Sequence, residues 1–303
     1  MGGQPPARLL VSTEPASCEE LLAVAVDAAR MAGGLLLERS RAGSEREVES
    51  KSSPTDLVSE ADLASERAIR ALLAERRPED GYVGEEGGSA DGSSGLAWVV
   101  DPLDGTVNFL FGIPQWCVSV AVRDGRETLA GAVYDPNRDE LFTATRDGAP
   151  MLRGPQGVVQ LAGPLAGTPS RSQTTGEPAA PPVTLAPSSG AETLAGAMVA
   201  TGLAYGADVR RAQAQVLARL APRVRDIRRF GSAALDLTWT AAGRYDAYFE
   251  RSVKQWDVAA GVLICERAGL SVRDLPTHEN LPWGVLVAPA TLVEPLFALV
   301  AGP

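Results

Sequence analysis

The sequence predicts a layered α+β / α/β fold, in which helices and sheets alternate and a cleft lies between two halves. Three observations support this prediction. Apolar residues recur at helical spacing near the N-terminus, short apolar segments joined by turn residues follow, and helical and strand patterns alternate after residue 193. The chain of 303 residues is long enough for one large domain or for two smaller ones that pack together.

The first elements are expected to be two helices. Residues 1–16 contain Gly, Gln and Pro without periodicity and are predicted to be a disordered N-terminal arm. Ser17 and Glu20 form a capping-box pattern ahead of apolar residues at helical spacing, which predicts a helix to about residue 41. A second helix is expected over 58–76, because a proline follows just beyond its end.

A meander of strands is expected next, completing an α+β half over residues 17–153. Short strands are predicted at 82–83, 96–100, 115–122, 128–134 and 140–145, with the turn sequences RDGRE and DPNRD between the last three. We expect them to form an antiparallel sheet. Residues 154–192 are dense in Pro, Gly, Ser and Thr, which favours a long surface loop inserted between the halves.

Residues 193–303 are predicted to form an α/β half. Helices are expected at 210–221, 232–242, 258–268 and from about 291, and strands at 224–227, 245–249, 270–273 and 284–288. No internal repeat is visible. The functional site is expected between the two halves.

The composition excludes several classes of function. The 28 Lys and Arg against 38 Asp and Glu give a formal net charge of −10, which argues against general binding of nucleic acid or an anionic membrane. The N-terminal segment has no apolar core of signal-peptide length, and no later apolar stretch reaches the roughly 20 residues of a membrane span. The three cysteines are far apart and include no CxxC pair, which indicates neither a disulfide framework nor a zinc site. We expect a cytoplasmic protein.

The segment WVVDPLDGTVNF carries the strongest chemical signal. An apolar strand ends at Asp101, Pro102 forces a turn, and Asp104, Gly105 and Thr106 begin a helical turn. Two carboxylates three residues apart at a strand end can converge on one cation. A group of Asp and Glu without His or Cys suits Mg²⁺. Backbone N–H groups at the start of a helix can bind phosphate oxygens, so these features together predict a phosphate ester as substrate.

Each acidic candidate also has an ordinary structural explanation. Glu85, in GEEGG, could be a solvated turn residue, and DPLDGT could be a simple β-turn. Asp257 could cap the helix that follows it, and Asp62 could be an exposed helical charge. The order and spacing of the four segments make it improbable that all of these explanations hold together.

These residues and their order resemble the inositol monophosphatases, Mg²⁺-dependent phosphomonoesterases of the lithium-sensitive phosphatase superfamily. The two signatures are the segments 98–109 and 256–261, with KSSPTD at 51–56, Asp62 and the segment 84–86 upstream of them. The resemblance covers about residues 17–300, apart from the segment 154–192, which is longer than the family pattern. It implies a layered αβαβα sandwich of the sugar phosphatase type and a homodimer.

The resemblance also implies roles for individual residues. Glu85, Asp101 and the carbonyl of Leu103 would hold one Mg²⁺, and Asp101, Asp104 and Asp257 a second. Glu85 and Thr106 would orient the attacking water, and Asp62 would accept a hydrogen bond from the Thr106 hydroxyl. Gly105 and Thr106 would bind the phosphate group. The positions implied to contact the substrate are Leu103, Asp104, Gly105, Thr106, Gly231, Ser232, Ala233, Glu250 and Asp257.

The implied activity is hydrolysis of myo-inositol 1-phosphate or a similar polyol monophosphate. Glu250 is a polar acceptor suited to a polyol, although it could instead pair with Arg251 or Lys254 as a solvated strand-end residue. One alternative keeps the chemistry with another small ester: histidinol phosphate, fructose 1,6-bisphosphate or 3′-phosphoadenosine 5′-phosphate. A second alternative is a regulatory binding module with weak catalysis. The sequence does not decide whether Arg228 and Arg229 are surface charges or part of a dimer contact.

Overall fold

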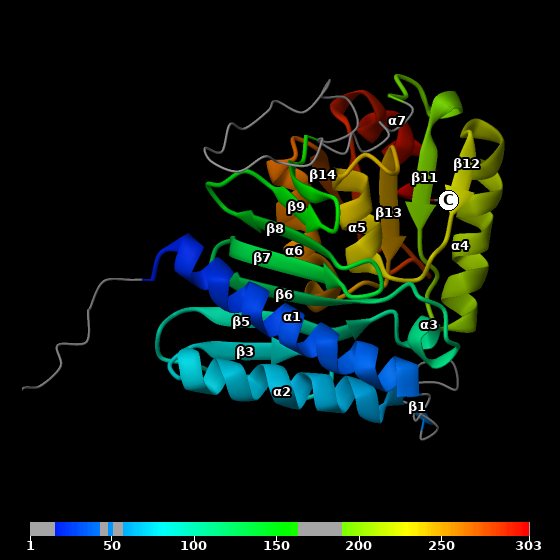
Figure 1. The fold of residues 1–303 in the computed structure, drawn as a ribbon. Coiled ribbons are helices and arrows are strands. Elements are labelled where there is room, and N and C mark those ends of the chain that lie inside the picture. Colours follow the sequence, from blue (N-terminus) through cyan, green and yellow to red (C-terminus); the bar gives the residue numbers. More distant parts are fainter. Residues whose placement is uncertain (1–15, 43–47, 51–56, 163–189, 303) are drawn as a thin grey trace, which may run out of the picture.

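Helices and sheets stack in five alternating layers in the computed structural model, which describes residues 16–42, 48–50, 57–162 and 190–302 (Figure 1). The predicted arm 1–16 and segment KSSPTD lie almost entirely outside these ranges, as do residues 163–189 of the predicted insertion. Within the described ranges, no helix combines the length and the apolar character that a bilayer span requires.

The first layer consists of helices α1 (Cys18–Ala42) and α2 (Glu60–Arg76), which pack against each other and against the first sheet. The predicted capping box of α1 is present, because the backbone N–H of Ser17 donates to Glu20 at 2.8 Å and the Ser17 hydroxyl accepts from the N–H of Glu20 at 3.2 Å. In α2 the equivalent pair is Ser59 and Asp62. The first helix buries a strip of small and aliphatic residues against the sheet.

The second layer is an eight-stranded sheet with the order β10-β9-β8-β7-β6-β5-β3-β4. Its strands are β3 (Gly81–Gly84), β4 (Ser89–Ala90), β5 (Ala97–Asp104), β6 (Cys117–Arg123), β7 (Thr128–Asp135), β8 (Glu140–Thr145), β9 (Met151–Gly154) and β10 (Gly157–Gln160). The antiparallel meander is confirmed for the central strands, but β3 pairs parallel with β5. Both faces of the sheet are covered, so its central strands are apolar at nearly every position.

Strand β5 shows how the alternation of side chains serves two cores. Trp98 and Val100 lie in the core beneath α1 and α2, whereas Val99 lies in the core on the opposite face. The third layer fills that opposite core with α5 (Ala233–Ala241) and α6 (Gln255–Arg267). These helices approach closely because Gly261 has no side chain: a Cβ there would lie 2.7 Å from Leu237.

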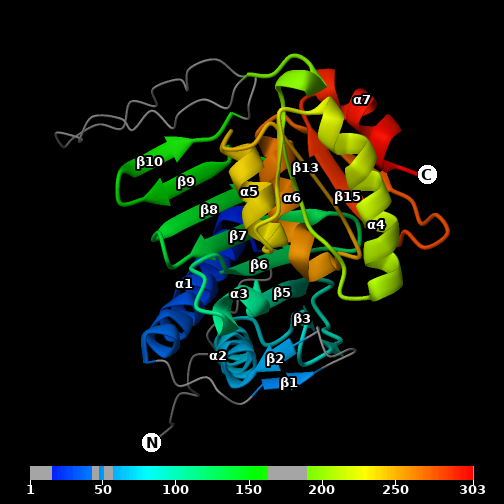
Figure 2. The same cartoon turned by 90° about the vertical axis from the view of Figure 1, so that its right-hand side faces the viewer.

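The fourth layer is a five-stranded sheet with the order β12-β11-β13-β15-β14, covered on its outer face by α4 (Ala207–Leu220) and α7 (Ala290–Val300) (Figure 2). Its strands are β11 (Met198–Thr201), β12 (Asp226–Arg228), β13 (Ala247–Arg251), β14 (Ser271–Leu275) and β15 (Gly284–Ala288). The strands β12, β11 and β13 are parallel, and β15 is antiparallel to β13 and β14. The layered α/β sandwich predicted from the sequence is confirmed.

Smaller elements complete the chain. They are the short helix α3 (Thr106–Leu110), the 3₁₀ turns Leu194–Gly196 and Ala221–Arg223, and the small ladder of β1 (Val48–Ser50) with β2 (Leu57–Ser59). Six strands were not expected, namely β1, β2, β4, β9, β10 and β11, and β2 includes residues 58–59, which were predicted to begin the second helix. The surface loop was predicted to begin at residue 154, but β10 pairs with β9 around a two-residue turn. Strand β10 lies at the exposed edge of the sheet, so its sequence lacks the apolar alternation by which strands are recognised.

Candidate active site

An irregularity in β5 brings Asp101 and Asp104 to the same cavity. Asp101 is paired with Ser119 and Asp104 with Cys117, so three steps along β5 match two steps along β6. In a regular strand these aspartates would point to opposite faces, but one extra residue restores a common side. Pro102 has no N–H to donate, which a bulge tolerates. The motif DPLD is therefore a strand-end bulge, and both carboxylates line one cavity of about 290 Å³.

Glu85 and Asp257 reach the same cavity from two other elements. Glu85 follows the parallel neighbour of β5, whose last residue is paired with Val100, so it lies beside Asp101. Asp257 is in the first turn of α6, where its Oδ2 accepts the backbone N–H of Lys254 at 2.7 Å. Carboxylate oxygens of Glu85, Asp101 and Asp257 lie within 4.8 Å of one another. The helix cap expected as the ordinary explanation for Asp257 is present, and the same residue belongs to the cluster.

Burial and mutual repulsion make the cluster a poor place for negative charge without a cation. Burial, followed by repulsion from Glu85, Asp104 and Asp257, raises the pKa of Asp101 well above its usual value. Burial is also the largest cause for Asp257, whose pKa is likewise raised strongly, and for Asp104, whose pKa is raised to about 6. A bound cation would remove this repulsion.

The donor atoms fit a hard divalent cation. The three clustered ligands are carboxylates, and the only histidine of the sequence, His278, is not among the residues that line the cavity. Oxygen-only donor sets suit Mg²⁺ rather than Zn²⁺. Leu103, whose carbonyl was expected to bind metal, also lines the cavity. The chemistry of these residues is therefore compatible with the predicted magnesium site.

Thr106 connects the cavity to a buried carboxylate. Its hydroxyl donates to Oδ1 of Asp62 at 2.9 Å, which is the hydrogen bond that the family resemblance implied, and lies 3.1 Å from the carbonyl oxygen of Leu103. Asp62 is fully buried, and its Oδ2 accepts the backbone N–H and the hydroxyl of Ser59 at 2.9 and 2.6 Å. Asp62 is thus not the exposed helical charge of the ordinary explanation.

Asp104 and Ser232 connect the end of β5 to the start of α5. The Ser232 hydroxyl donates to Oδ2 of Asp104 at 2.7 Å, and the backbone N–H of Ala234 donates to the same oxygen at 2.7 Å. Ser232 is the N-cap of α5 and is almost fully buried. Of the predicted substrate positions in this segment, Gly231 and Ala233 line the cavity, whereas Ser232 does not and instead fixes the orientation of Asp104.

Glu250 lines the cavity near the end of β13. Its Oε2 accepts the hydroxyl of Tyr248 at 3.0 Å, and burial raises its pKa to about 7. The alternative pairing with Arg251 is not found, because the buried guanidinium of Arg251 donates to backbone carbonyls of the loop before β15 and of the end of α7. Glu250 is therefore an acceptor that faces the cavity.

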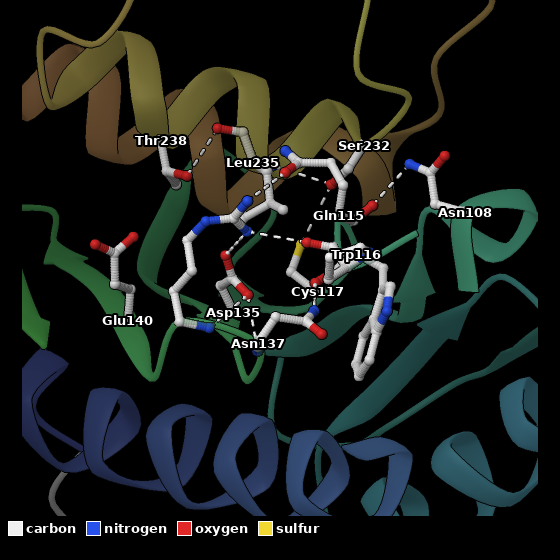
Figure 3. A network of polar contacts seen from close by, with 12 residues as sticks. Asn108, Gln115, Trp116, Cys117, Asp135, Asn137, Glu140, Ser232, Leu235 and Thr238 are labelled. Atoms are coloured by element: carbon white, nitrogen blue, oxygen red, sulfur yellow. Dashed lines mark hydrogen bonds and ion pairs between the residues drawn. The ribbon is translucent and has the colours of Figure 1, made fainter. Parts of the chain in front are cut away.

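A polar network holds the turn after β5 against the loop before α5 (Figure 3). The side-chain amide of Asn108 donates at 2.7 Å to the backbone carbonyls of both Gln115 and Phe230. The network continues through Gln115 and Arg138 to the buried carboxylate of Asp135. It positions the elements that carry Thr106 and Gly231 without contributing side chains to the cavity itself.

Sequence reasoning missed part of the cavity wall. The missed residues are Leu203, Ala204, Tyr205, Arg251, Ser252, Val253, Lys254 and Trp256. Arg229, whose role was left open, also lines the cavity. Arg228, in contrast, points elsewhere and pairs with Asp226 at 2.6 Å. The segment 203–205 follows β11, whose four residues come shortly after the Pro-rich stretch and carry no distinctive pattern. Only the placement of β11 beside β13 identifies it as part of the site.

Comparison with known proteins places the chain in a family. The family model described as "Inositol monophosphatase family" matches residues 17–297. The chain belongs to the inositol monophosphatase family. This match covers both sheets and every element that contributes to the cavity.

Relatives within the inositol monophosphatase family carry two kinds of name. The chain is 41% identical over 239 residues to "Inositol-1-monophosphatase" from Mycobacterium bovis, covering 77% of this chain and 74% of that protein. It is 36% identical over 262 residues to "Nus factor SuhB" from Escherichia coli K12, covering 86% and 87%. The crystal structure of "extragenic suppressor protein suhB" from Bartonella henselae has a TM-score of 0.75 and 30% identity, covering 92% of this chain and 98% of that one.

Proposed function

We propose that this protein is a Mg²⁺-dependent phosphomonoesterase that hydrolyses myo-inositol 1-phosphate to myo-inositol and phosphate. The observation that carries the proposal is the convergence of the Glu85, Asp101 and Asp257 carboxylates in one cavity that Thr106 also lines. Membership of the inositol monophosphatase family supports the reaction class.

The residues proposed to hold magnesium are those implied by the family. Glu85, Asp101 and the carbonyl of Leu103 would bind one ion, and Asp101, Asp104 and Asp257 a second. Because Oδ2 of Asp104 accepts from the N-terminus of α5, Oδ1 is the oxygen proposed as the ligand. When bound, Mg²⁺ supplies Lewis-acid stabilisation of the phosphate and of the leaving oxygen and lowers the pKa of bound water.

Thr106 and Asp62 are proposed to receive the proton of the attacking water. A hydroxyl has one hydrogen, and the shorter contact, to the charged Asp62, takes it. The lone pairs of the Thr106 oxygen can then accept a hydrogen bond from water in the cavity, and Glu85 provides a second acceptor. The water oxygen forms a bond to phosphorus, the ester P–O bond breaks, and the departing alkoxide takes a proton from a solvent water. The proton received by the Thr106–Asp62 pair returns to solvent before the next turnover.

The alcohol part of the substrate is proposed to lie between Glu250 and the start of α5. Glu250 would accept hydrogen bonds from ring hydroxyls, and the segment of Gly231 and Ala233 would form the adjoining wall. The backbone N–H groups of Gly105 and Thr106 would bind phosphate oxygens. A carboxylate acceptor favours a leaving group rich in hydroxyls over one that carries a second anion.

The test is phosphate release by the purified protein in Mg²⁺ from four esters: inositol 1-phosphate, histidinol phosphate, fructose 1,6-bisphosphate and 3′-phosphoadenosine 5′-phosphate. Asp101→Asn serves as the blank. We expect the highest kcat/KM for inositol 1-phosphate, lost in the variant. A higher kcat/KM for another ester would assign that ester as the substrate. Phosphate release by Asp101→Asn at the wild-type rate would overturn the proposed chemistry.

A binding role is the second candidate, and the relatives named Nus factor SuhB favour it. The two roles separate genetically. In a host strain that lacks this gene and shows a defect, Asp101→Asn should fail to correct the defect if hydrolysis is required. Correction by this variant would instead support a binding role that does not need turnover.

We also propose that the protein is a homodimer in the cytoplasm. Phe111, Ile113 and Phe230 are exposed by 73%, 48% and 39%, and Asn108 holds the segments that carry them together. Association of two copies would cover this apolar surface. The three cysteines are free, as is usual in a reducing compartment. Light scattering should give about twice the mass of one chain, and Phe111→Lys should shift it toward the monomer.

A further inference from the structure

Any side chain at residue 202 would overlap the carboxylate of Glu250, and the residue there is glycine. It directly follows β11, whose last residue is paired with Phe249 of β13, so Gly202 lies beside Glu250. A Cβ at residue 202 would lie 1.9 Å from Oε1, 2.0 Å from Cδ and 2.1 Å from Oε2 of Glu250. Side-chain carbons do not approach oxygen atoms this closely, because such distances are far inside van der Waals contact.

The backbone at Gly202 does not itself require glycine. Its φ is outside the positive range in which other residues are strained, whereas Gly231, which lines the cavity, has a φ of 85°. The reason for glycine at 202 is therefore space. The three atoms nearest to that space all belong to the Glu250 carboxylate.

The carboxylate has few other positions to take. Glu250 and Tyr248 are two residues apart on β13, so their side chains share a face, and the Tyr248 hydroxyl donates to Oε2 at 3.0 Å. Residues on either side of Glu250 in the strand are buried. A methyl group at residue 202 would push the carboxylate out of this hydrogen bond and into the cavity or toward Arg229, which also lines the cavity.

We propose that Gly202 is a specificity-determining positioning residue: by lacking a side chain, it lets Glu250 hold its carboxylate where the hydroxyls of a polyol phosphate reach it. This inference rests on the proposed function. Gly202 acts through Glu250 on the alcohol part of the substrate and leaves the phosphate-binding and metal-binding residues unaffected. Those residues lie elsewhere, in the loop after β3, on β5, at the start of α3 and on α6.

The test compares two esters in Gly202→Ala. For inositol 1-phosphate we expect kcat/KM to fall about 10- to 100-fold, the range for loss of a hydrogen bond to a charged group. For p-nitrophenyl phosphate, which has no ring hydroxyls, we expect kcat/KM within about threefold of wild type. The matched control is Gly206→Ala, because a Cβ there would lie 3.8 Å from the nearest atom, a γ-methyl of Val209.

A second comparison separates positioning from a general packing defect. The Glu250→Ala variant lacks the carboxylate that a side chain at residue 202 would overlap. Adding Gly202→Ala to this variant should therefore change kcat/KM for inositol 1-phosphate by less than about twofold. A further multiplicative loss in the double variant would overturn the proposal, as would equal losses for both esters in the single variant. Wild-type behaviour of Gly202→Ala on inositol 1-phosphate would also overturn it.

These outcomes are distinct from failure of the proposed function. If wild-type protein hydrolyses none of the esters, the proposed function fails and this inference falls with it. If wild type hydrolyses inositol 1-phosphate and Gly202→Ala does so equally well, only the role of Gly202 fails. Circular dichroism of each variant shows whether the fold is retained, so a loss of activity from unfolding is recognised directly.

Discussion

Replacing Thr106 with valine should greatly reduce turnover while leaving substrate affinity nearly unchanged. Valine has almost the same shape and removes only the hydroxyl, which donates to the buried Asp62 at 2.9 Å. Without it, the proposed path from the attacking water to Asp62 is interrupted. The backbone N–H groups of Gly105 and residue 106, proposed to bind phosphate, remain in place.

The expected magnitude follows from these contacts. A positioned proton acceptor contributes about 100- to 10,000-fold to a rate. Glu85 faces the same cavity and can replace part of that contribution, so we expect kcat to fall by about 100-fold and KM to change by less than about threefold. Asp62 is fully buried and loses one hydroxyl donor, so the free energy of unfolding should fall by about 2 kcal/mol.

Two assays measure these effects separately. Phosphate release in saturating Mg²⁺ gives kcat and KM, and denaturant unfolding gives the stability. The control is Thr106→Ser, which keeps the hydroxyl and should retain kcat within about fivefold. The proposed proton path is wrong if Thr106→Val keeps a kcat near that of wild type, or if the serine variant loses as much activity as the valine variant.

Three further predictions concern charge and stability. Asp104→Asn should stabilise the metal-free protein at pH 7.5 by up to about 3 kcal/mol, because burial raises the pKa of Asp104 from 3.8 to about 6. Between these two pKa values the folded wild type binds more protons than the unfolded chain, so its stability falls as the pH rises. Denaturant unfolding in EDTA should therefore show that the stability advantage of the variant at pH 7.5 is nearly lost at pH 4. An equal advantage at both pH values would contradict the reasoning. Arg251→Met should lower the free energy of unfolding by about 3–5 kcal/mol, because at least two buried backbone carbonyls lose a charged donor worth about 1.5–3 kcal/mol each. Unchanged denaturant midpoints would refute this. Mg²⁺ at 100 times its Kd should stabilise wild type by about 2.7 kcal/mol and Asp101→Asn far less, which a thermal shift titration measures.

Much of the fold was predictable because local signals and burial agree. The capping residues Ser17 and Glu20 mark the start of α1 and form the expected hydrogen bonds. The apolar runs of β5, β6 and β7 reflect burial on both faces of the sheet. The strand at 284–288 was predicted with the bounds that β15 has, because all five of its residues are apolar or glycine and buried.

The parts that could not be predicted depend on contacts between distant segments. The bulge that places Asp101 and Asp104 on one side exists only in the pairing with β6, and the motif DPLD by itself fits a turn equally well. Ser232 was expected to contact the substrate from the start of a helix. Its hydroxyl instead donates a hydrogen bond to Asp104, 128 positions earlier in the sequence. The local sequence gives no sign of the role of Gly202, because that role depends on the carboxylate of Glu250, which comes from the neighbouring strand.

The central claim is that the carboxylate cluster makes hydrolysis of a phosphate monoester depend on a divalent metal. The most direct measurement is phosphate release from inositol 1-phosphate by protein stripped with EDTA and then titrated with Mg²⁺, for wild type and Asp101→Asn in parallel. We predict no release before Mg²⁺ is added, saturable activation in wild type, and none in the variant. Release by the stripped wild-type protein, or equal activation of the variant, would contradict the claim.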